Sequence, residues 1–304
     1  MTITDAQLHE PAISLDWHDA DRELRFRMML EVELAYMEAV GIDRAVLFPI
    51  ETDWGPWVCE RMPERFAFVP MITPPGVVGG TPVDAPGFDE LVARYRSTPG
   101  CVAMRMMHTI PARLFGNSDP DAPPWRSDVD IYEPLLQACV AHGFPLFMST
   151  AGALDGPAEV LRRHPELLVI VDHLGLRQNP TFGLDSPPMR DLPRLLELAG
   201  IPNVRVKVSG VPTLSATGYP FDDLWDGLEQ VLDAFGAERL MWGSDISRVM
   251  GRAGAVQLAQ PGVEYARHTY AEALHYLKHT DRLSAEQKDW LLGRTAATVL
   301  SWEP

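Results

Sequence analysis

Short apolar runs, rich in Val, Ile, Phe and Met, alternate along the chain with longer segments of helical periodicity. This alternation is typical of βαβ units and predicts a parallel sheet. The runs predict eight strands: Ile3–His9, Arg44–Pro49, Phe66–Ile72, Cys101–Met107, Phe144–Thr150, Leu167–His173, Asn203–Ser209 and Arg239–Ser244. The helical segments are Arg25–Val40, Phe88–Tyr95, Ile131–His142, Ala158–His164, Leu192–Ala199 and Phe221–Phe235.

Eight strands joined through helices, with no break in the alternation, close more readily into a (β/α)8 barrel than into an open sheet. Two further helical stretches, Val263–His279 and Ser284–Leu300, predict a C-terminal helical extension, the second beginning with capping-box spacing. The segment Glu51–Arg65 is too rich in Pro and Trp for a helix to be assigned from the sequence. No linker-like run divides the chain, so residues 1–304 are predicted to form a single α/β TIM-barrel domain.

Acidic residues outnumber basic ones, 42 to 26, which gives a formal charge of −16. Such a charge repels nucleic acid and anionic lipid surfaces, so neither is expected as a partner. The cysteines, Cys59, Cys101 and Cys139, are odd in number and share no CxxC spacing, which argues against a disulfide framework or a zinc ribbon. The acidic N-terminus and the lack of a long apolar run indicate a mature cytoplasmic protein.

Polar side chains gather where the predicted strands end, which in a barrel is the catalytic face. They are Asp5, Gln7 and His9 on strand one, Arg105 and His108 at strand four, Asp172 and His173 at strand six, Lys207 and Ser209 on strand seven, and Asp245 after strand eight. Alternation places Lys207 and Ser209 on one face of their strand, with valines on the other. Because a buried ammonium needs an anion, Lys207 is expected to face a substrate carboxylate or Asp245.

Asp245 follows the apolar run Leu240–Trp242 and a Gly-Ser turn. A carboxylate on a rigid strand end, in a poorly hydrated pocket, has the raised proton affinity that a general base needs. The competing interpretation of Asp245 is a cap on the following helix. For Asp5 a structural role is favoured, and for Gln7 and His9 the alternative is a buried polar pair without chemistry.

Five motifs of the chain resemble motifs of the amidohydrolase superfamily. They are Asp-Ala-Gln-Leu-His, Val-Asp-His-Leu-Gly, Val-Lys-Val-Ser-Gly, Trp-Gly-Ser-Asp and the closing Leu-Leu-Gly-Arg-Thr-Ala. The motifs are spread over nearly the whole chain, and their order is most similar to that in the amidohydrolase 2 branch. This branch includes 2-pyrone-4,6-dicarboxylate lactonase, 4-sulfomuconolactone hydrolase and several decarboxylases. The resemblance implies a TIM barrel in which Asp245 matches the aspartate that activates water. It also implies that His173 is an acid/base or substrate-contacting residue.

In the family, a divalent metal is bound by a His-x-His pair on strand one and by a histidine that ends strand five. This chain has Gln7 in the first position and Met148-Ser149-Thr150 at the end of strand five, so only His9 of these ligands remains. Zinc needs three or four strong donors. We therefore expect no metal cofactor. The alternative is a weakly held zinc or manganese ion on His9, His173 and Asp245.

The favoured hypothesis is hydrolysis of a small carboxylate-bearing lactone, or a similarly activated ester or amide, in the catabolism of an organic acid. Asp245 would take a proton from water, while His173 and His9 polarise the carbonyl group. The side chains of Arg105 and Lys207 would bind the substrate carboxylate. The residues expected to bind the substrate are Arg105, Lys207, Gln7, His108 and Ser209.

Two alternatives stay open. The first is nonoxidative decarboxylation of an aromatic or dienoic acid, with Asp245 or His173 protonating the ring carbon; decarboxylases of this branch normally keep the metal, which counts against it. The second is a barrel that has lost catalysis and serves as a binding subunit, which the two missing ligands motivate. For a homodimer, the segment Asp53–Trp57 and the helical tail offer contact surfaces.

Overall fold

The strands of the structure coincide with the apolar runs. The computed structural model describes residues 1–11, 21–77, 80–112, 124–178, 187–246 and 268–302. The parallel strands are β1 (Thr4–Leu8), β2 (Arg44–Leu47), β3 (Phe66–Phe68), β4 (Met71–Thr73), β5 (Thr81–Pro82), β6 (Met104–Met107), β9 (Leu146–Ser149), β10 (Val169–Val171), β11 (Val204–Ser209) and β12 (Leu240–Gly243). Two short strands, β7 (Thr109–Ile110) and β8 (Trp125–Arg126), pair antiparallel.

The strands form the predicted barrel, in the orders β1-β2-β3 and β12-β11-β10-β9-β6-β4-β5. A parallel bridge between Phe68 and Cys101 joins the two sheets on one side. On the other side, the backbone N–H of Asp245 donates to the carbonyl oxygen of Gln7 at 3.0 Å. The predicted third strand is divided into β3 and β4 around Pro70, since proline has no N–H to offer the ladder. The expected fold class is thus confirmed.

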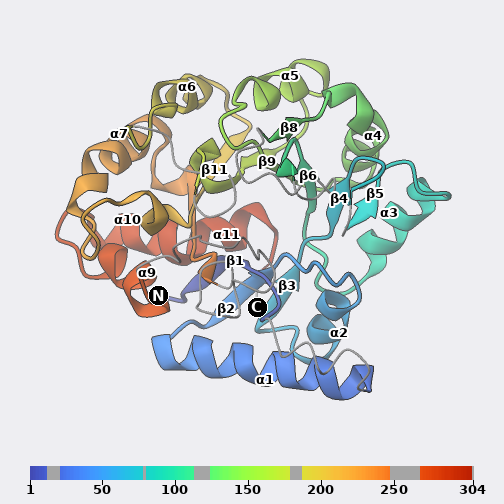
Figure 1. Ribbon diagram of the computed structural model, residues 1–304, viewed down its shortest axis with the longest axis horizontal. Coiled ribbons are helices and arrows are strands. Elements are labelled where there is room, and N and C mark those ends of the chain that lie inside the picture. The colour runs from blue at the N-terminus through green and yellow to red at the C-terminus, as the bar shows by residue number, and fades with distance from the viewer. Residues whose placement is uncertain (12–20, 78–79, 113–123, 179–186, 247–267, 303–304) are drawn as a thin grey trace.

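Helices surround the strands, as Figure 1 shows. They are α1 (Arg22–Val40), α2 (Trp54–Arg61), α3 (Phe88–Ser97), α4 (Glu133–His142), α5 (Asp155–Arg163), α6 (Leu192–Glu197), α7 (Trp225–Phe235), α9 (Tyr270–Lys278), α10 (Ala285–Asp289) and α11 (Thr295–Val299). Helix α1 ends at Gly41 and α4 at Gly143, each with the left-handed backbone that glycine adopts without strain. None of the helices in the described segments has the length and apolar content of a membrane span.

Helix α2 lies in Glu51–Arg65, the segment for which the sequence assigned no helix. Pro56 lies in the first turn of α2, where backbone N–H groups have no partner within the helix, so the missing donor does no harm. Trp54 and Val58, four residues apart, are buried on the same face of the helix. Burial of this face outweighs the weak helical pattern of the sequence.

The C-terminal extension is helical, as predicted. Residues 263–267 of the expected first stretch lie outside the described residues, and α9 starts after them. The predicted capping box is present: the backbone N–H of Gln287 donates to Ser284 Oγ at 3.2 Å and that of Ser284 donates to Gln287 Oε1 at 2.8 Å. Between α10 and α11 the segment Trp290–Arg294 forms a π-helical turn.

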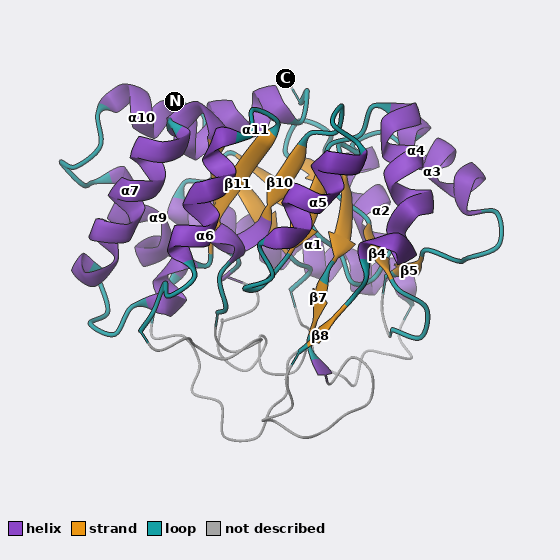
Figure 2. Cartoon of the chain, turned by 90° about the horizontal axis from the view of Figure 1, so that it is seen from above, coloured by secondary structure: helices purple, strands orange, loops and turns teal. Residues whose placement is uncertain are grey.

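The interior of the barrel is apolar towards its amino-terminal end, where the chain's own C-terminal segment closes it. Its core comprises Ala6, Val46, Phe48, Ala67, Val69, Ala103, Phe147, Ile170, Met241, Ala296, Leu300 and Trp302. The rings of Phe48 and Phe147 meet edge to face, with their centroids 5.1 Å apart. Figure 2 shows α10 and α11 at one end of the barrel and β7 and β8 at the other, where the strands end. The polar strand ends therefore lie opposite this apolar closure.

Candidate active site

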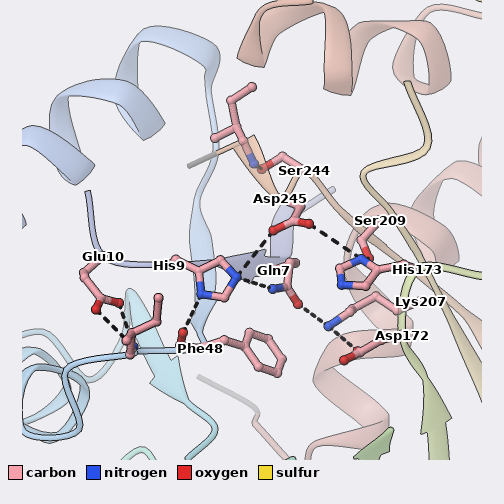
Figure 3. A network of polar contacts seen from close by, with 12 residues as sticks. Gln7, His9, Glu10, Phe48, Asp172, His173, Lys207, Ser209, Ser244 and Asp245 are labelled. Carbon is pink, nitrogen blue, oxygen red and sulfur yellow. Dashed lines mark hydrogen bonds and ion pairs between the residues drawn. The ribbon is translucent and has the colours of Figure 1, made fainter. Parts of the chain in front are cut away.

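Asp245, at the end of β12, lies between two histidines (Figure 3). Its Oδ1 is 3.5 Å from His9 Nε2 at the end of β1, and its Oδ2 is 3.7 Å from His173 Nδ1 at the end of β10. Its side chain is only 1% exposed. Three strands thus bring a carboxylate and two imidazoles together, which are the groups that move protons in hydrolysis.

The backbone at these strand ends turns sharply to present the side chains. Asp245 has a φ of 56° and His173 a φ of 54°, both in the left-handed region that side chains with a Cβ adopt only at some energetic expense. Non-glycine residues in this conformation cluster at functional sites. The Nδ1 of His173 also lies 2.8 Å from Ser209 Oγ on β11, which fixes the plane of the imidazole.

Asp5 anchors the turn before Asp245. Its Oδ1 accepts hydrogen bonds from the backbone N–H groups of Ser244, at 2.8 Å, and Gln7, at 3.0 Å. The hydroxyl of Tyr270 donates to Oδ2 at 2.8 Å. Complete burial raises the pKa of Asp5 to about 6, although these hydrogen bonds act in the opposite direction. Asp5 therefore has the amide-binding structural role that the sequence favoured, and it joins β1 to β12 directly beneath the site.

A buried ion triad lies below the histidines. Asp172 Oδ1 is 2.6 Å from Lys207 Nζ, and its Oδ2 accepts from Arg105 Nε at 2.8 Å. Burial works to raise the pKa of Asp172, but the charges of Lys207 and Arg105 together hold it well below its usual value. Burial lowers the pKa of Lys207 to about 8 despite the pairing with Asp172. At neutral pH the triad therefore carries more positive than negative charge.

Gln7 links this triad to the histidines. Its Oε1 accepts a hydrogen bond from Lys207 Nζ, and its Nε2 lies 3.0 Å from His9 Nε2. The other ring nitrogen of His9, Nδ1, is 2.6 Å from the carbonyl oxygen of Phe48. Glu10 holds the end of β1 in place, because its carboxylate accepts from the backbone N–H groups of Ile50 and Glu51.

These contacts bear on the metal that the resemblance implies. No three His, Cys, Asp or Glu side chains of the described segments converge on a point where they could hold a metal ion. The Oε1 of Gln7 is already bound by an ammonium, and the Nε2 of His9 faces the amide of Gln7. The alternative ligand set of His9, His173 and Asp245 does not converge in this way either, because His173 Nδ1 lies 2.8 Å from Ser209 Oγ, and His9 with Asp245 supplies too few donors for zinc. The described residues therefore do not fit a resident divalent metal.

The structure brings most of the predicted site residues together. Arg105 and Lys207 are part of this cluster, but their anionic partner is Asp172, whereas we had expected a substrate carboxylate. His108 is the exception. It lies apart, in a groove of about 450 Å³ that Arg126 and Glu159 also line. Burial and the nearby charge of Arg126 lower the pKa of His108 to about 4.

Sequence reasoning missed the roles of Asp172, Glu10 and Tyr270. Asp172 precedes His173 directly, and the apolar run before it was a usable signal that its carboxylate is buried. In a barrel, the loops that follow the strands shape the mouth of the site. Parts of two such segments, residues 113–123 and 179–186, lie outside the described residues.

Comparison with known proteins supports the family resemblance. A family model described as amidohydrolase matches residues 4–302. An L-fucono-1,5-lactonase from Burkholderia ambifaria is 32% identical over 133 residues, which are 42% of this chain and 43% of that protein. A 4-sulfomuconolactone hydrolase from Rhizobium radiobacter is 29% identical over 119 residues, 39% of this chain and 38% of that protein. Each match thus spans less than half of the relative's length.

The fold of the chain is also similar to that of solved amidohydrolase structures. An amidohydrolase from Burkholderia multivorans, crystallised with bound zinc, aligns over 99% of both chains with a TM-score of 0.67 and 21% identity. At this identity the similarity concerns the fold, and the zinc is a property of that protein. Because the family model covers almost the whole barrel and its strand-end residues, the chain belongs to the amidohydrolase family.

Proposed function

We propose that the chain hydrolyses a small lactone, with Asp245 as the general base. One observation carries the proposal: a carboxylate only 1% exposed lies within 4 Å of two imidazoles, at the carboxyl ends of three barrel strands. The two relatives with 29% and 32% identity are named for the lactones that they open. A lactone suits a site without a metal, because its carbonyl is activated and its leaving group stays attached to the product.

In the proposed reaction Asp245 takes a proton from water as the water oxygen bonds to the lactone carbonyl carbon. The ring C–O bond then breaks, and the departing alkoxide takes up the proton. His173 is proposed to donate the hydrogen bond that stabilises the developing oxyanion. His9 is not proposed to contact the lactone carbonyl, because both of its ring nitrogens face protein groups. Its proposed place is beside Asp245.

The substrate is proposed to be an organic acid, as the sequence suggested, but the cations act differently. Arg105 and Lys207 are buried and paired with Asp172, so they do not reach out to a carboxylate. With Asp172 they leave one positive charge in excess, which offsets the negative charge of the Asp245 carboxylate, so that the site need not repel an anionic substrate. Ser209 is proposed to act through His173, and His108 is no longer included among the substrate contacts.

The first test is Asp245→Asn, assayed by proton release with a panel of aldono-1,5-lactones and 4-sulfomuconolactone. We expect kcat/KM to fall by roughly 10²- to 10⁴-fold, the usual contribution of a general base, with an unchanged circular dichroism spectrum. The matched control is Asp233→Asn on the exposed face of α7, which should retain full activity.

The same assay separates the alternatives. Carbon dioxide release from an aromatic acid, without lactone opening, would favour decarboxylation. A wild-type protein that binds lactones without opening any of them, and binds them equally after Asp245→Asn, would favour the binding subunit. Either result contradicts the proposed hydrolysis.

A further inference from the structure

Lys207 fixes the orientation of the Gln7 side chain. An ammonium only donates hydrogen bonds, so the Gln7 atom that faces Lys207 Nζ must be the amide oxygen. Lys207 is completely buried, and its Nζ lies 4.0 Å from the ring centroid of Phe48 and 4.6 Å from that of Phe147. The two rings and Asp172 surround the ammonium. Figure 3 shows Lys207 between Asp172 and Gln7.

The orientation of Gln7 in turn determines which nitrogen of His9 carries hydrogen. With its oxygen on Lys207, Gln7 presents its NH₂ group to His9 Nε2 at 3.0 Å. An amide nitrogen only donates, so Nε2 must be the accepting, unprotonated nitrogen. The Nδ1 atom faces the carbonyl oxygen of Phe48 at 2.6 Å, and that oxygen only accepts. The hydrogen of His9 is therefore on Nδ1.

This arrangement matters for Asp245, whose Oδ1 is 3.5 Å from His9 Nε2. A hydrogen on Nε2 would make His9 a hydrogen-bond donor to Asp245, and a carboxylate that accepts such a bond is a weaker base. We propose that Lys207 and Gln7 are positioning residues that hold His9 in its Nδ1–H tautomer, so that His9 donates no hydrogen bond to Asp245 and does not weaken it as a base. The catalytic part of this inference rests on the proposed function; the tautomer itself does not.

The experiment reads the tautomer directly, by ¹⁵N NMR of the histidine rings in the free protein at pH 7. The spectrum of His9→Asn identifies the His9 signals. For the wild type we expect a protonated Nδ1 and an unprotonated Nε2. In Gln7→Glu the carboxylate still accepts from Lys207 but offers His9 no donor, so we expect Nε2 to become protonated. With a lactone that the wild type opens, kcat should then fall on the order of 10-fold with little change in KM.

A matched control is Gln178→Glu. Gln178 is likewise buried at the carboxyl ends of the strands, but its amide donates to the carbonyl oxygen of Ser209 at 3.1 Å. This variant should leave the His9 signals unchanged. If Gln7→Glu does not fold, Lys207→Met serves instead: without the ammonium the Gln7 amide can turn over, and the His9 signals should show a mixture of tautomers.

A wild-type His9 protonated on Nε2 would overturn the inference, and this measurement needs no variant to fold. An unchanged His9 tautomer in Gln7→Glu would overturn it as well. Because the spectra are recorded without substrate, this failure is distinct from failure of the proposed hydrolysis, which Asp245→Asn alone decides.

Discussion

At the scale of the single residue, burial works to raise the pKa of the acidic side chains of this protein, and nearby charges decide whether it succeeds. Asp172 is buried between two cations and stays ionised. Within the described part of the chain, Asp5 and Glu33 form no ion pair, and burial dominates. It raises the pKa of Asp5 to about 6 and, with the charge of Asp5 adding to the effect, that of Glu33 to about 8. Glu33 is therefore protonated in the folded protein at neutral pH.

This predicts how stability depends on pH. Glu33 has an ordinary pKa of 4.5 and a raised pKa of about 8 when folded, so the native state binds more protons between these values. The free energy of unfolding should therefore fall as pH rises from about 5 to 8. Glu33→Gln removes this titration, and above pH 8 the variant should be more stable than the wild type by on the order of a few kcal/mol.

Urea unfolding at pH 5, 7 and 9 measures this difference. The control is Glu38→Gln, on the exposed side of the same helix, which should keep the wild-type pH dependence. Parallel pH profiles for the wild type and Glu33→Gln would contradict the prediction.

At the scale of the element, the contact between β1 and β12 sets the position of Asp245. Gly243 ends β12, and a Cβ atom there would lie 2.8 Å from Gln7 Cβ and 2.9 Å from the Gln7 backbone nitrogen. Real side chains do not approach that closely, so the two strands must separate in Gly243→Ala. We expect a loss of stability of about 1–3 kcal/mol and a larger relative loss of hydrolysis, because Asp245 moves away from His9.

Chemical denaturation and lactone hydrolysis, measured side by side, check this prediction. Gly200→Ala is the control, because nothing lies within 4 Å of a Cβ atom at that position. It should leave activity and stability nearly unchanged. Full activity in Gly243→Ala would mean that the site tolerates a displaced β12.

At the scale of the whole molecule, the C-terminal segment covers the amino-terminal end of the barrel whose first strand is β1. Trp302 packs into the barrel core, its carbonyl oxygen accepts from Arg44 Nη1 at 3.3 Å, and the guanidinium of Arg44 lies 5.2 Å from the ring centroid. Phe48 belongs to the same core and also contacts Lys207, so the floor of the site rests on this packing.

Trp302→Ala should therefore destabilise the protein by about 3–5 kcal/mol, the usual effect of removing a large aromatic side chain from a core. Thermal unfolding measures the change. Tyr36→Ala, which removes an aromatic ring 41% exposed on α1, is the control and should change stability by less than about 0.5 kcal/mol. Equal melting temperatures for the two variants would show that the C-terminal segment does not close the core.

Several functional features were predictable because their signals are local. The period-two pattern of strands ending in polar residues identified the barrel and placed His9, His173 and Asp245 at one end of it. The same alternation could have shown that His108 faces away from Arg105, since the two residues are three positions apart. Helix α2 was missed because its stability comes from burying Trp54, a contact that no local pattern reports.

The sequence by itself determined the barrel, its strand ends and the identity of the residues placed there. Only the tertiary structure decided their partners: Lys207 binds Asp172 and Gln7, and through Gln7 it reaches His9. The reason is physical. Hydrogen-bond roles depend on which donor meets which acceptor across the barrel, and Lys207 lies 200 positions from Gln7. Strand periodicity fixes the face on which a side chain lies, whereas barrel closure fixes what it meets there.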